Sequence, residues 1–219
     1  MIQSHQDTNQ IEKFFSKYKP LRFKRNVVVV KPDDVLESIY YIKSGYVKQS
    51  TISKTGEEFI ITIYRPGSFF AISLALHRKT STYSFETMSE AELIKAPVQE
   101  IITLLDTQPT FARELLGRVT SGLNSMVGRM ETLVFGSANQ KVAAVLLQNA
   151  QRFGRKTASA IEIGLPLTHQ QLASLTGLTR ETVSIEMAKL KKAEILTYKG
   201  KTITIFNISA LRSLAPSSI

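Results

Sequence analysis

The sequence predicts an α+β protein in three parts: an N-terminal antiparallel β-barrel, a long dimerisation helix, and a C-terminal domain of helix-turn-helix type. Three observations lead to this fold. Short β-branched segments separated by turns fill residues 20–98. One heptad pattern runs without interruption through residues 109–135. Two capped helical segments, followed by a hairpin pattern, close the chain.

The barrel is predicted from strands that end at recognisable turns. The segment RNVVVVKPDD ends at a Pro-Asp turn, SIYYIKSGYVKQSTI alternates around a Gly turn, KTGEEFIITIY has the pattern of a hairpin arm, and RPGSFF is a turn. Short strands at this spacing are typical of a small antiparallel sandwich or barrel. Short helices are expected near residues 8–18 and 98–106.

Apolar residues in the long helix repeat at alternating spacings of four and three, which predicts pairing of two helices along one stripe. The simplest pairing is with a second copy of the chain in a parallel dimer, and the alternative is packing on the helix's own domain. The stripe consists of Ala112, Leu116, Val119, Leu123, Met126, Met130 and Leu133. Apolar residues beside it are expected to pack against the barrel, namely Phe111, Leu115, Val127 and Val134.

The segment FGSANQ interrupts the helical pattern and predicts a hinge at residues 136–139. The predicted domains are therefore the β-barrel over residues 1–108, the dimerisation helix over 109–136 and a C-terminal domain over 137–219. The last domain has 11 Lys and Arg but only 4 Asp and Glu, so it carries +7 of the chain's net charge of +10. This balance favours a nucleic-acid partner, although a basic surface also serves solubility alone.

The helix-turn-helix is predicted from its caps. Thr168 followed by Gln171 forms a capping-box pattern, Gly177 suits a left-handed turn, and Thr179 caps the second helix. Helical spacing places Val183, Met187 and Leu190 on one buried stripe of that second helix. Ser184, Ala188 and the other outward residues then face away from the core.

The outward face has the chemistry of base recognition. Arg180 at the tip can donate hydrogen bonds to guanine, and Glu181 can accept a hydrogen bond from the cytosine amino group. Ile185 can contact a thymine methyl group. A solvated face would hold more Lys and Glu and no exposed Ile. The alternative for Glu181 is electrostatic stabilisation at the positive end of its helix.

The segment LTHQQLASLTGLTRETVSIEMAKLKKAEIL resembles the winged helix-turn-helix of the Crp/Fnr transcription regulators. SIYYIKSGYVK and YRPGSFF resemble the cyclic-nucleotide-binding-type, jelly-roll-like barrel of the same family. The resemblance covers nearly the whole chain in the family's order of parts. It implies a sequence-specific regulator that binds a palindromic DNA site as a homodimer, with RNA polymerase as a further partner.

The resemblance implies which residues of this chain contact DNA, position by position. Arg180 and Glu181 match the pair that contacts the G·C pair of TGTGA-like half-sites. Ile185 replaces the second base-contacting Arg of the cyclic-AMP receptor, and Ser184 beside Glu181 is similar to the Fnr-like variant. Phosphate contacts are implied for Thr168, His169, Gln170, Thr179 and Thr182, and are expected for the wing residues Lys199 and Lys201, whose alternative is a solvated hairpin tip.

The sensor departs from the cyclic-nucleotide pattern. Ala71 and Ile72 replace the Gly-Glu pair for the ribose, and Thr82 and Tyr83 replace the Arg-Ser/Thr pair for the phosphate. Without that Arg, a buried phosphate lacks its counter-charge, so we expect no cyclic AMP. An apolar effector pocket is predicted instead, with a filled cavity and a constitutive regulator as the alternative. Its lining is Phe69, Phe70, Ile72, Tyr83 and Met126.

The sequence contains no cysteine, which excludes an iron–sulfur cluster. His77 is a lone candidate ligand without a second one, so neither a haem nor a metal site is expected. No nucleotide-cradling Gly motif, HExxH or GxSxG occurs, and no catalytic residues are identified. We therefore expect a cytoplasmic regulator rather than an enzyme or a membrane protein. A ligand-binding module without DNA contact remains the alternative and leaves the basic C-terminal domain unexplained.

Overall fold

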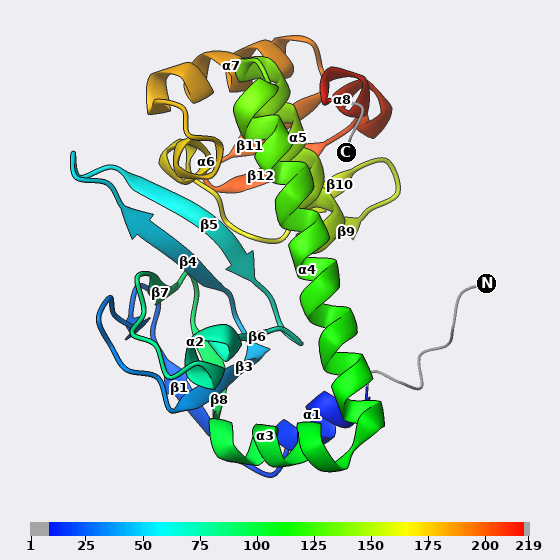
Figure 1. Cartoon of the computed structure of the whole chain (residues 1–219). Helices are drawn as coiled ribbons and strands as arrows, with labels where there is room; N and C mark the ends of the chain where they lie inside the picture. The colour runs from blue at the N-terminus through cyan, green and yellow to red at the C-terminus, as the bar shows by residue number, and fades with distance from the viewer. Residues whose placement is uncertain (1–8, 217–219) are drawn as a thin grey trace. The chain divides into compact units, whose positions relative to one another are not determined.

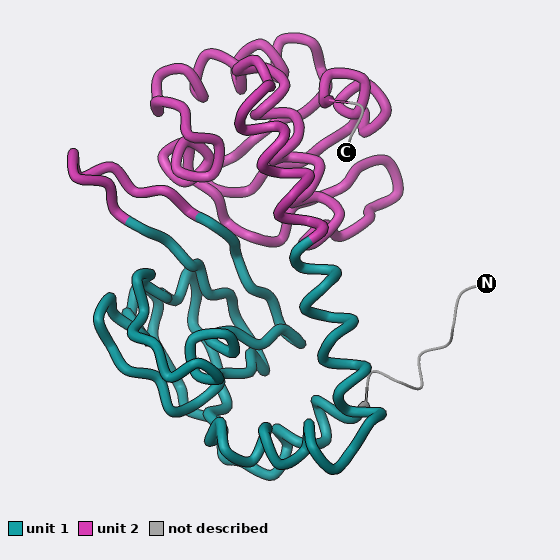
Figure 2. Tube along the Cα trace, viewed as in Figure 1, with its two compact units in different colours: residues 1–51, 61–123 teal, residues 52–60, 124–219 magenta. Residues whose placement is uncertain are grey.

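The computed structural model describes residues 9–216. Residues 1–8, with most of the polar N-terminus, and residues 217–219 lie outside this range. The chain divides into two compact units (Figure 2). Unit 1 comprises residues 1–51 and 61–123, and unit 2 comprises residues 52–60 and 124–219. The tip of one hairpin of the N-terminal region is thus counted with the C-terminal unit.

Unit 1 is built on two four-stranded antiparallel sheets, in the orders β1-β8-β3-β6 and β2-β7-β4-β5 (Figure 1). This confirms the predicted jelly-roll-like domain, although the two sheets remain separate rather than closing into one barrel. The strands are β1 (Pro20–Phe23), β2 (Val28–Val30), β3 (Ser38–Ser44), β4 (Val47–Ile52), β5 (Glu58–Tyr64), β6 (Phe69–Phe70), β7 (Ser84–Thr87) and β8 (Ala91–Pro97).

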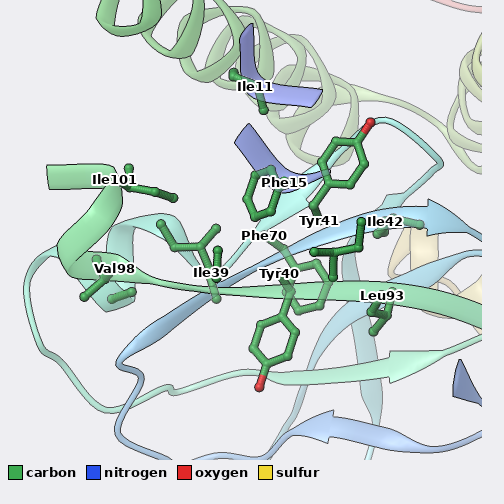
Figure 3. Packing of buried hydrophobic residues seen from close by; sticks show 14 of the residues in the cluster. Ile11, Phe15, Ile39, Tyr40, Tyr41, Ile42, Phe70, Leu93, Val98 and Ile101 are labelled. Carbon is green, nitrogen blue, oxygen red and sulfur yellow. The ribbon is translucent and has the colours of Figure 1, made fainter. Parts of the chain in front are cut away.

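The core of unit 1 joins the sheets to the short helices α1 (Asn9–Phe15), α2 (Ile72–Leu76) and α3 (Val98–Thr107). Phe15 of α1 stacks on Tyr41 of β3 with 4.9 Å between ring centroids. Ile101 of α3 is buried in the same core cluster (Figure 3). The expected helices near residues 8–18 and 98–106 are confirmed in their described parts, whereas α2 was not predicted because its five residues lie between strand signals.

Helix α4 (Pro109–Phe135) is continuous over 27 residues, as predicted. Its first turns bury Phe111 and Leu115 in the core of unit 1, which confirms their expected packing. Val127 and Val134 belong to unit 2 and are 48% and 65% exposed, so their packing against the barrel stays a prediction. Five stripe residues are 45–65% exposed: Leu116, Val119, Leu123, Met126 and Met130.

Unit 2 contains α5 (Ala138–Phe153), α6 (His169–Thr176), α7 (Arg180–Lys192) and α8 (Ile208–Leu214). Its sheet has the order β11-β12-β10-β9. The strands are β9 (Gly154–Lys156), β10 (Ile161–Ile163), β11 (Leu196–Lys199) and β12 (Thr202–Ile205). Helix α5 begins within the predicted hinge, because Ser137 and Gln140 form a capping box there. Strand β9 and helix α8 were not predicted.

The described helices include none that is both long and apolar enough to cross a membrane.

The burial of α7 predicts a sharp contrast between two of its residues. Met187 is fully buried, so Met187→Ala should lower the free energy of unfolding by about 2–5 kcal/mol. Ile185, two residues earlier, is 57% exposed and serves as the matched control. Ile185→Ala should change the free energy of unfolding by no more than about 0.5 kcal/mol. Urea unfolding measures both, and equal losses would contradict this burial.

Candidate nucleic-acid interface

Two capped helices joined by a left-handed turn form the helix-turn-helix. The Thr168 hydroxyl accepts from the amide of Gln171 at 3.1 Å, and the Gln171 side chain accepts from the Thr168 amide at 2.9 Å. Gly177 ends α6 with φ 64°, a conformation that favours glycine. The Thr179 hydroxyl then caps α7 by accepting from the amide of Thr182. The predicted caps and turn are therefore confirmed.

Helix α7 buries one stripe and exposes the opposite face. Val183, Met187 and Leu190 are buried, as predicted. Arg180, Glu181 and Ile185 are exposed, together with Ala188. Because the buried stripe fixes the rotation of the helix, the exposed side chains are available to a ligand outside the protein.

Ser184 is half-buried and makes two hydrogen bonds within unit 2. Its Oγ donates to the carbonyl of Arg180 at 2.8 Å and lies 2.9 Å from Nδ1 of His169. The His169 ring packs edge to face on Tyr198 of β11, with 5.2 Å between centroids. His169 is thus the residue that joins the start of α6 to α7 and to the wing strand.

The remaining predicted phosphate contacts lie on the surface. Gln170 and Thr179 are exposed, as are Lys199 and Lys201 at the hairpin of β11 and β12. Gly200 between the two lysines has φ 62° and makes the turn. The Lys201 carbonyl accepts from the amide of Leu167, which attaches the hairpin next to the Thr168 cap.

Glu186 is a buried acid that anchors α7 to α5. Its carboxylate accepts from Lys189 at 2.7 Å and from the Asn139 amide at 3.2 Å. The hydrogen bond from Lys189 is the largest influence and lowers the pKa of Glu186, with Asn139 acting in the same direction. Asn139 lies in the first turn of α5, so this contact ties the recognition helix to the hinge.

Arg129, also within unit 2, is a half-buried cation with backbone partners. Its Nη2 donates to the carbonyls of Ile60 and Leu175, both at 2.6 Å, and its guanidinium lies 5.4 Å from the centroid of the Phe59 ring. Burial, followed by the charge of Arg152, lowers the pKa of Arg129 to about 10. Leu175 lies in the last turn of α6, and the partial negative charge at the C-terminus of a helix stabilises a cation bound there.

Arg129, Glu186 and Tyr198 were not singled out from the sequence. Each lies in an ordinary helical or strand pattern, and its role depends on at least one partner 29 or more residues away. The only sequence signal is a charge at a position that helical spacing places close to an apolar stripe, as Glu186 lies next to Met187.

The predicted effector residues of unit 1 lie in or against an aromatic core. The Phe70 ring stacks between Tyr40 and Phe85, at 5.1 and 5.0 Å between centroids, and Tyr64 adjoins both phenylalanines. Phe69, Ile72 and Tyr83 pack partly buried against this cluster, whereas Met126 is 52% exposed and does not belong to it.

A cavity of about 280 Å³ in unit 1 has a different lining, which includes none of the five predicted effector residues. It is lined by Val29, Val30, Asp34, Val35, Leu36, Glu37, Ser38, Tyr40 and Lys95.

His77 lies at the end of α2, where its Nδ1 is 2.8 Å from the Ser73 carbonyl. Within residues 9–216, no cluster of three His, Asp or Glu side chains is arranged to hold a metal ion.

Comparison with known proteins identifies the family. Residues 140–214 match the Crp-like helix-turn-helix domain, and residues 20–108 match the cyclic nucleotide-binding domain. The fumarate and nitrate reduction regulatory protein of Vibrio cholerae is 30% identical over 215 residues, which cover 95% of this chain and 82% of that protein. The chain belongs to the Crp/Fnr family.

Other relatives agree with this assignment. The global nitrogen regulator of a Nostoc species is 29% identical over 185 residues, covering 84% of this chain and 83% of the relative. The structure of FixK2 from Bradyrhizobium japonicum superimposes with a TM-score of 0.80 at 21% identity, over 91% of this chain and 98% of that one. This Crp/Fnr protein is a DNA-binding transcription regulator and not an enzyme, as predicted.

The Glu186 anchor predicts an acid-sensitive contribution to stability. Because the folded pKa lies below the unfolded value of about 4.3, the contribution is complete above that value and is lost as the pH falls through the folded pKa. Glu186→Gln should therefore destabilise the protein most near neutral pH and little near pH 3. Urea unfolding of both proteins at several pH values tests this prediction. A difference in the free energy of unfolding between wild type and variant that does not change with pH would contradict it.

Proposed function

We propose that this regulator binds a palindromic DNA site as a homodimer held together by α4. The observation that carries the proposal is the apolar stripe of α4, in which five of the seven residues are 45–65% exposed on the single chain. Exposed apolar stripes of this length mark surfaces that another molecule covers. The heptad spacing fits a second copy of the same helix in parallel.

Base recognition is assigned to the exposed N-terminal part of α7. Arg180 bonds guanine in the major groove and Glu181 accepts from the paired cytosine's amino group. Ile185 is 57% exposed on the same face and tolerates a thymine methyl where the cyclic-AMP receptor has Arg. The Ser184 hydroxyl adjoins these side chains, although the hydrogen bonds to His169 and the Arg180 carbonyl already engage it.

Backbone contacts orient this helix without specifying sequence. Thr168, Gln170, Thr179 and Thr182 supply them around the two helix N-termini, together with His169. Lys199 and Lys201 supply them from the wing, where both are exposed. Their positive charge attracts DNA through release of counterions, so it strengthens binding to all sequences alike.

The sensor is proposed to bind no cyclic nucleotide and no metal cofactor. A small apolar effector suits the side chains of Phe69, Phe70, Ile72 and Tyr83. The stacked rings of Tyr40, Phe70 and Phe85 support a second candidate, a constitutive regulator whose sensor core is filled by its own side chains. Since such regulators act at promoters, we also propose RNA polymerase as a partner and the cytoplasm as the place of action.

Affinity for a defined duplex tests the assignment of base and backbone contacts. The probe carries two inverted TGTGA-type half-sites with centres about 34 Å apart, and its control replaces the G·C pairs by A·T pairs. Arg180→Ala or Glu181→Ala should reduce discrimination between the two duplexes by about 1–3 kcal/mol per position.

Lys199→Ala should instead weaken binding to both duplexes equally and reduce the salt slope by about one per protomer. Lys31→Ala, an exposed lysine of unit 1, is the charge-matched control. Titrations by fluorescence anisotropy at several salt concentrations distinguish these effects. Unchanged discrimination after both α7 substitutions would contradict the assignment.

The dimer proposal predicts that a charge on the α4 stripe separates the subunits. Leu123 is 58% exposed, so Leu123→Glu should leave each chain folded while burying a carboxylate in the paired helices. Sedimentation should show a monomer that no longer binds the palindrome tightly. Val35→Glu, at a 63% exposed position of unit 1, is the control and should remain dimeric. A dimeric Leu123→Glu variant would refute pairing along this stripe.

A further inference from the structure

The His169 side chain contacts both the recognition helix α7 and the wing strand β11. It is half-buried as the first residue of α6, with Ser184 of α7 on its Nδ1 side and Tyr198 of β11 against its ring. The other charged groups near this contact are Arg180 and Lys191, the latter 5.2 Å from the centroid of the Tyr198 ring. No carboxylate is among these neighbours.

The hydrogen bonds of Ser184 determine which imidazole nitrogen carries the proton. Its hydroxyl has one hydrogen, which it donates to the Arg180 carbonyl at 2.8 Å. Nδ1 of His169, 2.9 Å from the same oxygen, must then be the donor of the second bond. In the neutral ring, this leaves Nε2 as an acceptor with a lone pair.

A neutral ring of this tautomer cannot donate to a phosphate. Phosphate oxygens are acceptors, so an Nε2 lone pair directed at one would be repelled. Only the imidazolium keeps the Nδ1 bond to Ser184 and also offers an Nε2–H to DNA. Without DNA, burial and then the charge of Arg180 lower the pKa of His169, so the free protein near neutral pH holds the neutral ring.

We propose that His169 is a proton-linked positioning residue, whose Nδ1–H holds Ser184 against α7 and whose Nε2 takes up a proton when the helix-turn-helix binds DNA. The proposal rests on the proposed phosphate contact of His169 and goes beyond it by making affinity depend on pH. Binding tightens as the pH falls from about 8 to 6. The limit is a tenfold change per pH unit for each subunit that takes up one proton.

Affinity for the palindromic duplex, measured between pH 6 and pH 8.5 at constant ionic strength, tests the proposal. His169→Asn places an amide donor close to the position of Nδ1, so it keeps the Ser184 bond but does not titrate. The affinity of the His169→Asn variant for the duplex should not change with pH, whereas the wild-type affinity should increase as the pH falls. The other histidines are present in both proteins and serve as an internal control. Parallel pH profiles of the two proteins would overturn the proposal.

A second variant separates proton linkage from a purely structural role. Ser184→Ala removes the partner of Nδ1, so neutral His169 becomes free to carry its proton on Nε2 and donate to phosphate. The pH dependence of binding should therefore shrink in Ser184→Ala, while thermal unfolding confirms that the variant is folded. A full pH dependence in this variant would also overturn the proposal.

Imidazole nitrogen shifts in NMR spectra of the DNA-free protein provide a direct check. They should show the proton of neutral His169 on Nδ1, and a proton on Nε2 would refute the tautomer assignment. Failure of the proposed function gives a different result: wild-type protein would show no preference for the palindromic duplex at any pH.

Discussion

The burial of one stripe of α7 is the constraint on which the DNA-binding surface depends. Val183, Met187 and Leu190 are withdrawn from water in the core of unit 2, which fixes the rotation of the helix about its axis. Arg180, Glu181 and Ile185 are exposed as a consequence, since they lie on the other side of the same helix. The Glu186 anchor to Asn139 and the His169 bond to Ser184 reinforce this rotation from two further elements.

Features set by local physics were predictable from the sequence. The caps at Thr168 and Thr179, the left-handed Gly177 and the buried stripe each depend on residues within one or two helical turns. Arg129 and the tautomer of His169 were not predictable, because their partners at Ile60, Leu175, Ser184 and Tyr198 come together only in the folded chain. The short elements α2, β9 and α8 carry too few residues for a periodic pattern.

Helix α4 illustrates how a correct pattern leaves a finer assignment open. Its apolar residues separate into Phe111 and Leu115, which enter the core of unit 1, and a stripe that remains exposed. The heptad repeat predicted that stripe, yet it did not indicate which apolar residues beside it are buried: Phe111 is, whereas Val127 and Val134 are exposed. The aromatic core of unit 1 shows the same limit, since the Phe70 stack depends on the pairing of β6 with β3 and on side-chain packing between two separate sheets.

We propose that the exposed face of α7 determines which DNA sequence this Crp/Fnr regulator binds. Selection of binding sites from random duplex DNA measures this most directly, with wild-type protein and with Arg180→Ala as comparison. We expect a palindrome with a G·C pair in each half-site and with thymine tolerated opposite Ile185. The Arg180→Ala variant should lose the preference for guanine. A non-palindromic motif, or one indifferent to G·C, would contradict the proposal.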